Sequence, residues 1–208
     1  MSGLVWYFDF VSPFSYLQFA TYPELYQRSD TELKPTLFAG LLDHFGQKGP
    51  AEIEPKRLHT FRYTQWEATK RGVTLRYPPA HPFNPLNALR LAIAFGGTYD
   101  TVRAIFDFIW AEGRSPTDEW QALCDAVGVP GADVLAGSEG VKAQLRENGE
   151  EAIRLGVFGV PTFVVDGYLF WGLDATGLLF DYLNDPQLFA TDEMKRLEHL
   201  PVAAARKA

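Results

Sequence analysis

An apolar strand that runs directly into a serine-proline pair limits the fold of this chain more than any other feature. Residues 4–10, Leu-Val-Trp-Tyr-Phe-Asp-Phe, are short, apolar and aromatic, which is typical of a buried strand. Ser12 is a favoured helix N-cap, and Pro13 fits the first position of a helix. The sequence therefore predicts a serine hydroxyl at the positive end of a helix, where a buried strand ends.

The rest of the pattern predicts an α/β fold with one sheet assembled from both ends of the chain. The first helix runs from Pro13 to about Arg28 and is kinked or restarted at Pro23. Strands are expected at 33–38, 161–165 and 168–171, the last two joined by an Asp-Gly turn. After a loop over 39–55, helices are expected at 56–71, 84–95, 99–113, 115–127, 140–155 and from Asp174 to before Pro186. Residues 1–50 and 157–200 then form the sheet domain, and 51–156 form a helical insertion.

Composition excludes several classes of function. The net charge of -7 and the lack of a basic run argue against a nucleic-acid partner. No apolar stretch is long enough to span a bilayer, so we expect no membrane partner. A single cysteine, Cys124, allows no internal disulfide and suggests no metal site, and its helical pattern predicts a small core residue. With no signal peptide in the pattern, we expect a cytoplasmic protein.

Five motifs, in this order and spacing, resemble those of a known family. They are Phe-Asp-Phe-Val-Ser-Pro-Phe-Ser-Tyr-Leu at 8–17, Gly-Pro-Ala-Glu-Ile with Pro-Lys-Arg at 49–57, Pro-Phe-Asn-Pro-Leu at 82–86, Phe-Gly-Val-Pro-Thr at 158–162 and Trp-Gly-Leu-Asp at 171–174. The chain resembles the DsbA-like branch of the thioredoxin superfamily, in particular the 2-hydroxychromene-2-carboxylate isomerases and the related kappa-class glutathione transferases. The resemblance implies a thioredoxin-like fold with a large α-helical insertion.

In redox-active members of that superfamily, cysteines stand at the positions of Ser12 and Ser15. Serine cannot form a disulfide, so this chain is not predicted to be a disulfide oxidoreductase. The resemblance implies instead that Ser12 is catalytic, because it donates a hydrogen bond to the thiolate of bound glutathione and lowers the pKa of that thiol. The alternative is a plain helix cap, which Ser115-Pro116 illustrates in the same chain. Ser15 is expected to pack within the first helical turn.

The resemblance also implies a set of glutathione-binding residues. Val160 would precede a cis proline, Pro161, and would pair through its backbone with the cysteinyl part of glutathione. Asp174 is expected to cap the following helix and to hold the γ-glutamyl amine. Lys56, in the first turn of a helix, is expected to bind a carboxylate. With these residues, the implied glutathione site consists of Ser12, Lys56, Val160, Pro161, Trp171, Gly172, Leu173 and Asp174.

A second set is expected to contact the substrate. Its members are His44, Arg57, Phe83 and Asn84. Each also has a simpler interpretation: His44 and Arg57 as solvated side chains, Phe83 as core and Asn84 as a helix cap.

The activity implied by the resemblance is a glutathione-dependent cis-trans isomerisation of a conjugated aromatic acid, with glutathione as the cofactor and a small aromatic carboxylate as the substrate. Two alternatives remain open. The first is a kappa-class-like glutathione transferase or peroxidase, and the second is a redox-inactive module that binds peptides. A homodimer is also compatible with the resemblance.

Overall fold

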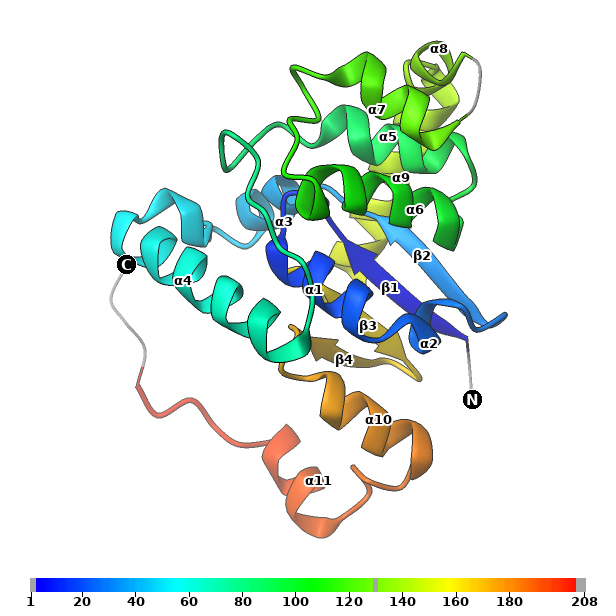
Figure 1. The fold of residues 1–208 in the computed structure, drawn as a ribbon. Coiled ribbons are helices and arrows are strands. Elements are labelled where there is room, and N and C mark those ends of the chain that lie inside the picture. The colour runs from blue at the N-terminus through cyan, green and yellow to red at the C-terminus, as the bar shows by residue number, and fades with distance from the viewer. Residues whose placement is uncertain (1–2, 129–130, 205–208) are drawn as a thin grey trace.

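A four-stranded sheet lies at the centre of the computed structural model, which describes residues 3–128 and 131–204 (Figure 1). Strands β1 (Leu4–Phe8) and β2 (Thr31–Pro35) are parallel. On the other side of β1 lies the antiparallel strand β3 (Thr162–Val165), which forms a hairpin with β4 (Tyr168–Trp171). The strand order β2-β1-β3-β4 joins both ends of the chain in one sheet, as the sequence predicts.

Helices fill the connections between these strands. Between β1 and β2 are α1 (Pro13–Thr21) and α2 (Pro23–Tyr26), so Pro23 restarts the helix as expected. After β4 come α10 (Thr176–Asn184) and α11 (Asp192–Glu198). The long segment between β2 and β3 contains α3 (Phe38–His44), the 3-10 turn η1 (Pro50–Glu52), α4 (Glu54–Arg71), α5 (Leu86–Ala94), α6 (Tyr99–Phe106), the π-helical η2 (Asp107–Ala111), α7 (Trp120–Val127), α8 (Ala132–Ala136) and α9 (Glu139–Arg154).

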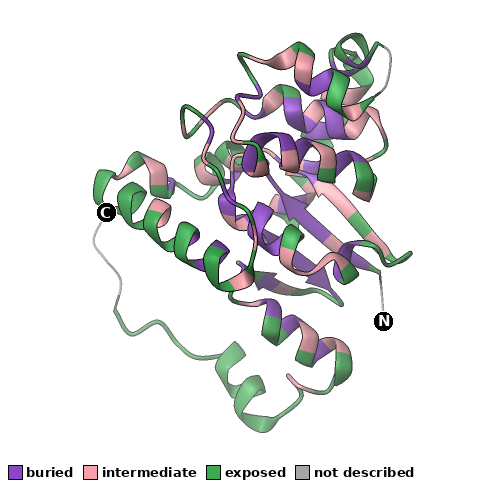
Figure 2. Ribbon diagram, viewed as in Figure 1, coloured by how far each residue is buried: buried purple, intermediate pink, exposed green. Residues whose placement is uncertain are grey.

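Alternate residues of β1 contribute to two separate apolar clusters. Trp6 and Phe8 belong to the larger cluster, and Tyr7 belongs to the smaller one. In Figure 1, α1 lies in front of the sheet and α9 lies behind it. Figure 2 shows β1 and β3 as buried strands, whereas α11 is exposed. Because β1 is covered on both faces, its run of large apolar residues is nearly unbroken.

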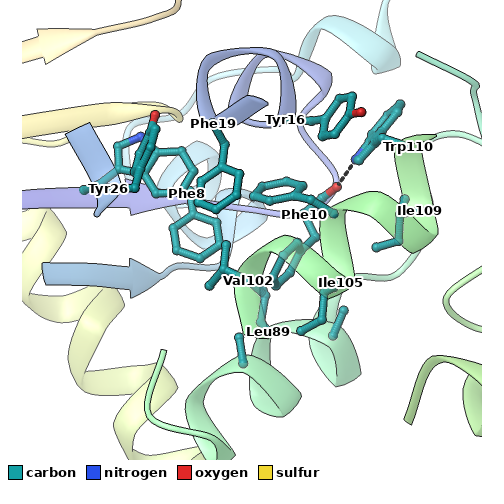
Figure 3. Close-up of a cluster of buried hydrophobic side chains, with 14 of the residues drawn as sticks. Phe8, Phe10, Tyr16, Phe19, Tyr26, Leu89, Val102, Ile105, Ile109 and Trp110 are labelled. Atoms are coloured by element: carbon teal, nitrogen blue, oxygen red, sulfur yellow. Dashed lines mark hydrogen bonds between the residues drawn. The ribbon is translucent and has the colours of Figure 1, made fainter. Parts of the chain in front are cut away.

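Aromatic side chains connect the sheet domain to the helices that follow it. Phe10 packs edge-on against Phe106, with ring centroids 4.7 Å apart. The indole Nε1 of Trp110 donates a hydrogen bond of 2.8 Å to the carbonyl oxygen of Phe10 (Figure 3). These contacts fix the chain just before Ser12 against the helical segment.

Several elements differ from the sequence-based expectations. The first strand ends at Phe8 rather than residue 10, and β2 covers 31–35 rather than 33–38. The predicted loop over 39–55 is wrong in its first part, because Phe38–His44 is helical. The expected helix at Ser115 begins only at Trp120, since the Ser115 hydroxyl accepts from the Asp118 N–H in a preceding turn.

Helices α8 and α11 were not predicted from the sequence. A local signal for α11 exists: the Thr191 hydroxyl accepts from the Met194 N–H at 3.3 Å, and acidic residues follow Thr191 in the first turn. No described residue of α11 is buried, so the apolar periodicity that normally indicates a helix is lacking. The prediction for Cys124 is confirmed, because it is a free, buried core residue.

Helix α9 is attached to the sheet by polar side chains. Glu151 accepts hydrogen bonds from Tyr7 Oη at 2.9 Å and from Lys34 Nζ at 2.6 Å, and Asn148 Nδ2 donates to the Pro35 carbonyl at 2.9 Å. The expected division of the chain at residues 50 and 156 stays a prediction. Within the described residues, no helix combines the length and apolar character needed to cross a membrane.

Candidate active site

A cavity of about 450 Å³ lies beside the first turn of α1. Its walls come from the carboxyl end of β1, from α3 and the start of α4, and from two loops around residues 82 and 159. Segments that are far apart in the sequence therefore meet at one place. Six of the residues predicted from the sequence line this cavity, and they are Ser12, Lys56, Arg57, Phe83, Val160 and Trp171.

Ser12 caps α1, as the sequence predicts. Its Oγ accepts a hydrogen bond of 3.2 Å from the Ser15 N–H, and its side chain is 7% exposed. Among the described residues, nothing accepts the proton of the Ser12 hydroxyl, so this proton remains available to a ligand. A hydroxyl donor at the N-terminus of a helix stabilises an anion placed beside it. Ser15 is fully buried and does not line the cavity.

Another part of the wall is built from the loop before β3 and the end of β4. The Val160–Pro161 peptide is cis, as expected. Val160 lines the cavity, and the carbonyl oxygen of Pro161 accepts from the Gly172 N–H at 2.8 Å. The Trp171 indole lies against Phe158 with ring centroids 4.9 Å apart, and it is 52% exposed. A largely exposed indole at a cavity wall is a surface on which a ligand can pack.

Cationic side chains form the outer rim. Lys48, Lys56 and Arg57 all line the cavity and are exposed. Within the described part of the chain, none of them forms an ion pair, whereas arginines elsewhere, such as Arg71 with Glu67, do. Glu52, the exposed acid on the same wall, accepts from the Gly49 N–H at 2.6 Å. Unpaired cations around a cavity favour a ligand with carboxylate groups.

Asp9 lies at the floor of the cavity and was not predicted as a site residue. It is completely buried, and its carboxylate oxygens accept from the N–H groups of Val11 at 3.0 Å and Phe38 at 2.8 Å. Burial raises the pKa of Asp9 to about 7, although the two N–H donors act in the opposite direction. Below that pH, Asp9 is neutral and places no negative charge under the Ser12 turn.

His81 is a second residue that sequence reasoning did not assign. It lines the cavity, and its Nε2 lies 2.9 Å from the carbonyl oxygen of Val11. Phe61 and Phe83 line the same wall, with ring centroids 5.6 Å and 6.3 Å from that of His81. Both Asp9 and His81 therefore hold the backbone of Val11, the residue before Ser12. For these two residues, the only signal of a functional role in the sequence is that Asp9 stands at the end of a buried strand.

The other predicted residues lie around the cavity or away from it. Pro161 and Gly172 do not line the cavity but are joined by the hydrogen bond from the Gly172 N–H to the Pro161 carbonyl oxygen. Leu173 is buried in the core. Asp174 is exposed, and the prediction that it caps α10 is wrong because Ala175 occupies the N-cap position.

Two of the predicted substrate residues do not line the cavity. The ring of His44, at the end of α3, lies against Phe45, with centroids 4.8 Å apart. Asn84 is exposed, and its Oδ1 accepts from the Leu86 N–H at 3.0 Å. Its simpler interpretation as a helix cap is also wrong, because Pro85 occupies the N-cap position of α5.

Comparison with known proteins identifies similar sequences and structures. The model of the DSBA-like thioredoxin domain family matches residues 4–184. A 2-hydroxychromene-2-carboxylate isomerase from Sphingobium xenophagum is 32% identical over 190 residues, which cover 86% of this chain and 96% of the relative. Glutathione S-transferase kappa 2 of Caenorhabditis elegans is 27% identical over 205 residues, covering 86% and 91%.

The fold is also similar to that of a solved structure. A 2-hydroxychromene-2-carboxylate isomerase superposes with a TM-score of 0.75 at 23% identity, and the match covers 90% of this chain and 97% of the other.

Proposed function

Since this chain belongs to the family of DSBA-like thioredoxin domains, we propose that it binds glutathione and uses its thiolate to isomerise a double bond in a conjugated aromatic acid. One observation carries the proposal: the free Ser12 hydroxyl at the start of α1 lies in the same cavity as the Val160 loop and the cationic rim. The named isomerase relative, with 32% identity, supports the same activity.

Glutathione is a tripeptide with a thiol and two carboxylates, and the cavity has a group suited to bind each part. The Ser12 hydroxyl and the positive end of α1 stabilise the thiolate. The backbone of Val160 pairs with the cysteinyl residue of glutathione, and Trp171 packs against the glutathione backbone. Lys56 binds a carboxylate of glutathione, while Arg57 is left for the carboxylate of the substrate.

The reaction is a reversible addition. In the cyclic substrate the C2–O bond to the ring oxygen first breaks, and the proton of the C2 hydroxyl moves to the phenol oxygen, which gives an open ketone conjugated to a cis double bond. The thiolate forms a C–S bond to the far carbon of that double bond; its π electrons form a new double bond to the carbonyl carbon, and the carbonyl π electrons move to the oxygen as an enolate. The former double bond is now single and rotates. The electrons then return, the C–S bond breaks, and the thiolate leaves unchanged. Arg57 keeps the substrate carboxylate in place while the bond rotates, and Ser12 stabilises the anion at both ends of the cycle.

Turnover with limiting glutathione tests this function. We expect the protein to interconvert 2-hydroxychromene-2-carboxylate and trans-o-hydroxybenzylidenepyruvate in large excess over glutathione, with all the thiol recovered at the end. Ser12→Ala should lower kcat/KM by about 100-fold, as loss of one donor to a reacting anion does in other enzymes. Ser115→Ala is the matched control, since Ser115 also precedes a proline and caps a turn at 3.0 Å but lies outside the cavity.

The kappa-class relative supports one second candidate, a glutathione transferase. Loss of one thiol for each substrate molecule converted would favour the transferase over the isomerase. Near-normal turnover by Ser12→Ala would contradict both enzymes, because both need the stabilised thiolate. Binding of peptides without any effect on a thiol would favour the redox-inactive module.

A further inference from the structure

The four residues from the end of β1 to the start of α1 form a tight turn that ends at Ser12. The Ser12 N–H donates to the Asp9 carbonyl oxygen at 3.1 Å, and the Val11 N–H donates to the Asp9 carboxylate at 3.0 Å. Among the described residues, no backbone N–H donates to the carbonyl oxygens of Phe10 and Val11, the two central residues of the turn. A carbonyl oxygen that water cannot reach needs a donor, so these two atoms depend on side chains.

Both side-chain donors come from the long helical segment between β2 and β3. The indole Nε1 of Trp110 donates to the Phe10 carbonyl oxygen at 2.8 Å (Figure 3). The Nε2 of His81 lies 2.9 Å from the Val11 carbonyl oxygen, which can only accept a hydrogen bond, so Nε2 carries the proton. The two rings lie against each other, with centroids 5.7 Å apart. One pair of rings therefore holds the two consecutive carbonyl groups that precede Ser12.

Trp110 is itself firmly anchored in the helical segment. It is completely buried, its carbonyl oxygen accepts from the Arg76 N–H at 2.7 Å, and its indole packs edge-on against Tyr77 with centroids 5.1 Å apart. It belongs to the π-helical turn η2, in which the Glu112 N–H donates to the carbonyl oxygen of Asp107, five positions earlier. Such widened helical turns are rare and frequently occur at functional sites. The indole N–H is therefore a donor with a fixed position.

Trp110 does not line the cavity, so any effect that it has on a reaction there must pass through the backbone. The Phe10 carbonyl group that it holds is two residues before Ser12, whose hydroxyl is a free donor in the cavity. A misplacement of about 1 Å at a reacting group can lower a rate by about 100-fold. A bond that fixes the turn therefore decides how well the hydroxyl reaches a sulfur anion.

We propose that Trp110 is a positioning residue for the thiol site: through the Phe10 carbonyl group, its indole N–H holds the Ser12 turn so that the hydroxyl stays where it donates to the sulfur of glutathione. The bond from His81 to Val11 is the second point of this hold. The helical segment thereby takes part in activating the thiol, although it contributes neither Ser12 nor the helix that Ser12 caps. The inference rests on the proposed function for the identity of the ligand, whereas the hold on the turn is a property of the free protein.

The thiol pKa of bound glutathione in two tryptophan variants tests the inference. Trp110→Phe keeps an aromatic ring but removes the N–H donor. Trp6→Phe is the matched control, because Trp6 is equally buried and its Nε1 also donates at 2.8 Å, but to the side chain of Gln18 rather than to the turn. By thiolate absorbance, we expect the thiol pKa to rise by about half a unit or more in Trp110→Phe and to stay unchanged in Trp6→Phe. Equal thiol pKa values in the two variants would overturn the inference.

Hydrogen exchange in the unchanged protein without glutathione guards against misfolding of Trp110→Phe. If the indole bond holds the turn, the indole proton of Trp110 and the amide protons of Val11 and Ser12 exchange through one common opening, with protection factors within about threefold of one another. Turn amides that are about 10-fold less protected than the indole proton would overturn the inference. Failure of the proposed function is a separate result, since the thiol pKa is then not lowered even in the unchanged protein; it would overturn the role in thiol activation, whatever the exchange shows of the turn.

Discussion

At the scale of single residues, the site depends on polar groups whose environment differs from that of the surface. The hydroxyl proton of Ser12 stays free, because the helix cap uses the hydroxyl oxygen as the acceptor of the Ser15 N–H. Asp9 is fully buried against two N–H donors. Ser12 was predictable because the cap and the proline that follows it are local signals, whereas the burial of Asp9 depends on α3 packing over it.

Asp9 should make stability depend on pH in a defined direction. Its folded pKa of about 7 is above the ordinary value of 3.8, so the folded protein binds a proton that the unfolded chain has lost between these values. Its contribution to stability is complete below pH 3.8 and is lost as pH rises to about 7. Relative to Asp9→Asn, we expect the free energy of unfolding to fall by about 4 kcal/mol between these limits.

Denaturant unfolding of both proteins at a series of pH values measures this difference. Asp9→Asn cannot titrate at this position and cancels the pH dependence of the other groups. A difference that stays constant from acid to neutral pH would contradict the raised pKa of Asp9.

At the scale of elements, α3 shows why part of the site escaped prediction. Its N-cap residue, Leu37, has no polar side chain, and Gly40 lies in its first turn. The N–H of Phe38 is instead bonded to Asp9, 29 positions earlier in the chain. A cap supplied from a distant strand leaves no local pattern, so the sequence predicts a loop here.

The loop before β3 requires a glycine at position 159. A Cβ there would lie 2.7 Å from Nε1 of Trp171, so Gly159→Ala must displace that indole from the cavity wall. We expect this variant to bind glutathione about 10-fold more weakly or worse, because the indole supplies packing surface. Isothermal titration calorimetry measures the affinity.

Gly149→Ala in α9 is the control for that variant. Nothing lies within 4 Å of an added Cβ at this position, so we expect unchanged glutathione affinity and a free energy of unfolding higher by about 1 kcal/mol. Equal glutathione affinity in Gly159→Ala and in the unchanged protein would show that Trp171 does not contribute to the site.

At the scale of the whole molecule, the sheet built from both ends was predictable because strand and turn signals are local. The connections between distant segments were not. His81 meets Val11 only when the loop near residue 81 lies against the Ser12 turn, and this bond joins positions 70 apart. Likewise, nothing in the pattern pairs Glu151 with Tyr7, 144 positions away. Pairing between distant polar side chains depends on the assembled fold.

The connection of α9 to the sheet should contribute to global stability. Burial raises the pKa of Glu151, but the hydrogen bonds from Lys34 and Tyr7 outweigh it and lower this pKa overall. Glu151→Ala leaves both donors without their acceptor, and we expect the free energy of unfolding to fall by about 2 kcal/mol. Glu150→Ala, on the exposed side of the same helix, should change it by less than about 0.5 kcal/mol. Equal unfolding midpoints for the two variants would contradict this role of Glu151.

The activation of a thiol by Ser12 is the claim on which the whole account depends. An ultraviolet titration of thiolate absorbance, for glutathione with the protein from about pH 5 to 9, measures it directly. We expect the thiol pKa of bound glutathione to be lowered from its value in solution, to rise by about one unit or more in Ser12→Ala, and to remain lowered in Ser115→Ala. Bound glutathione with its solution pKa, or with the same lowered pKa in both variants, would contradict the account.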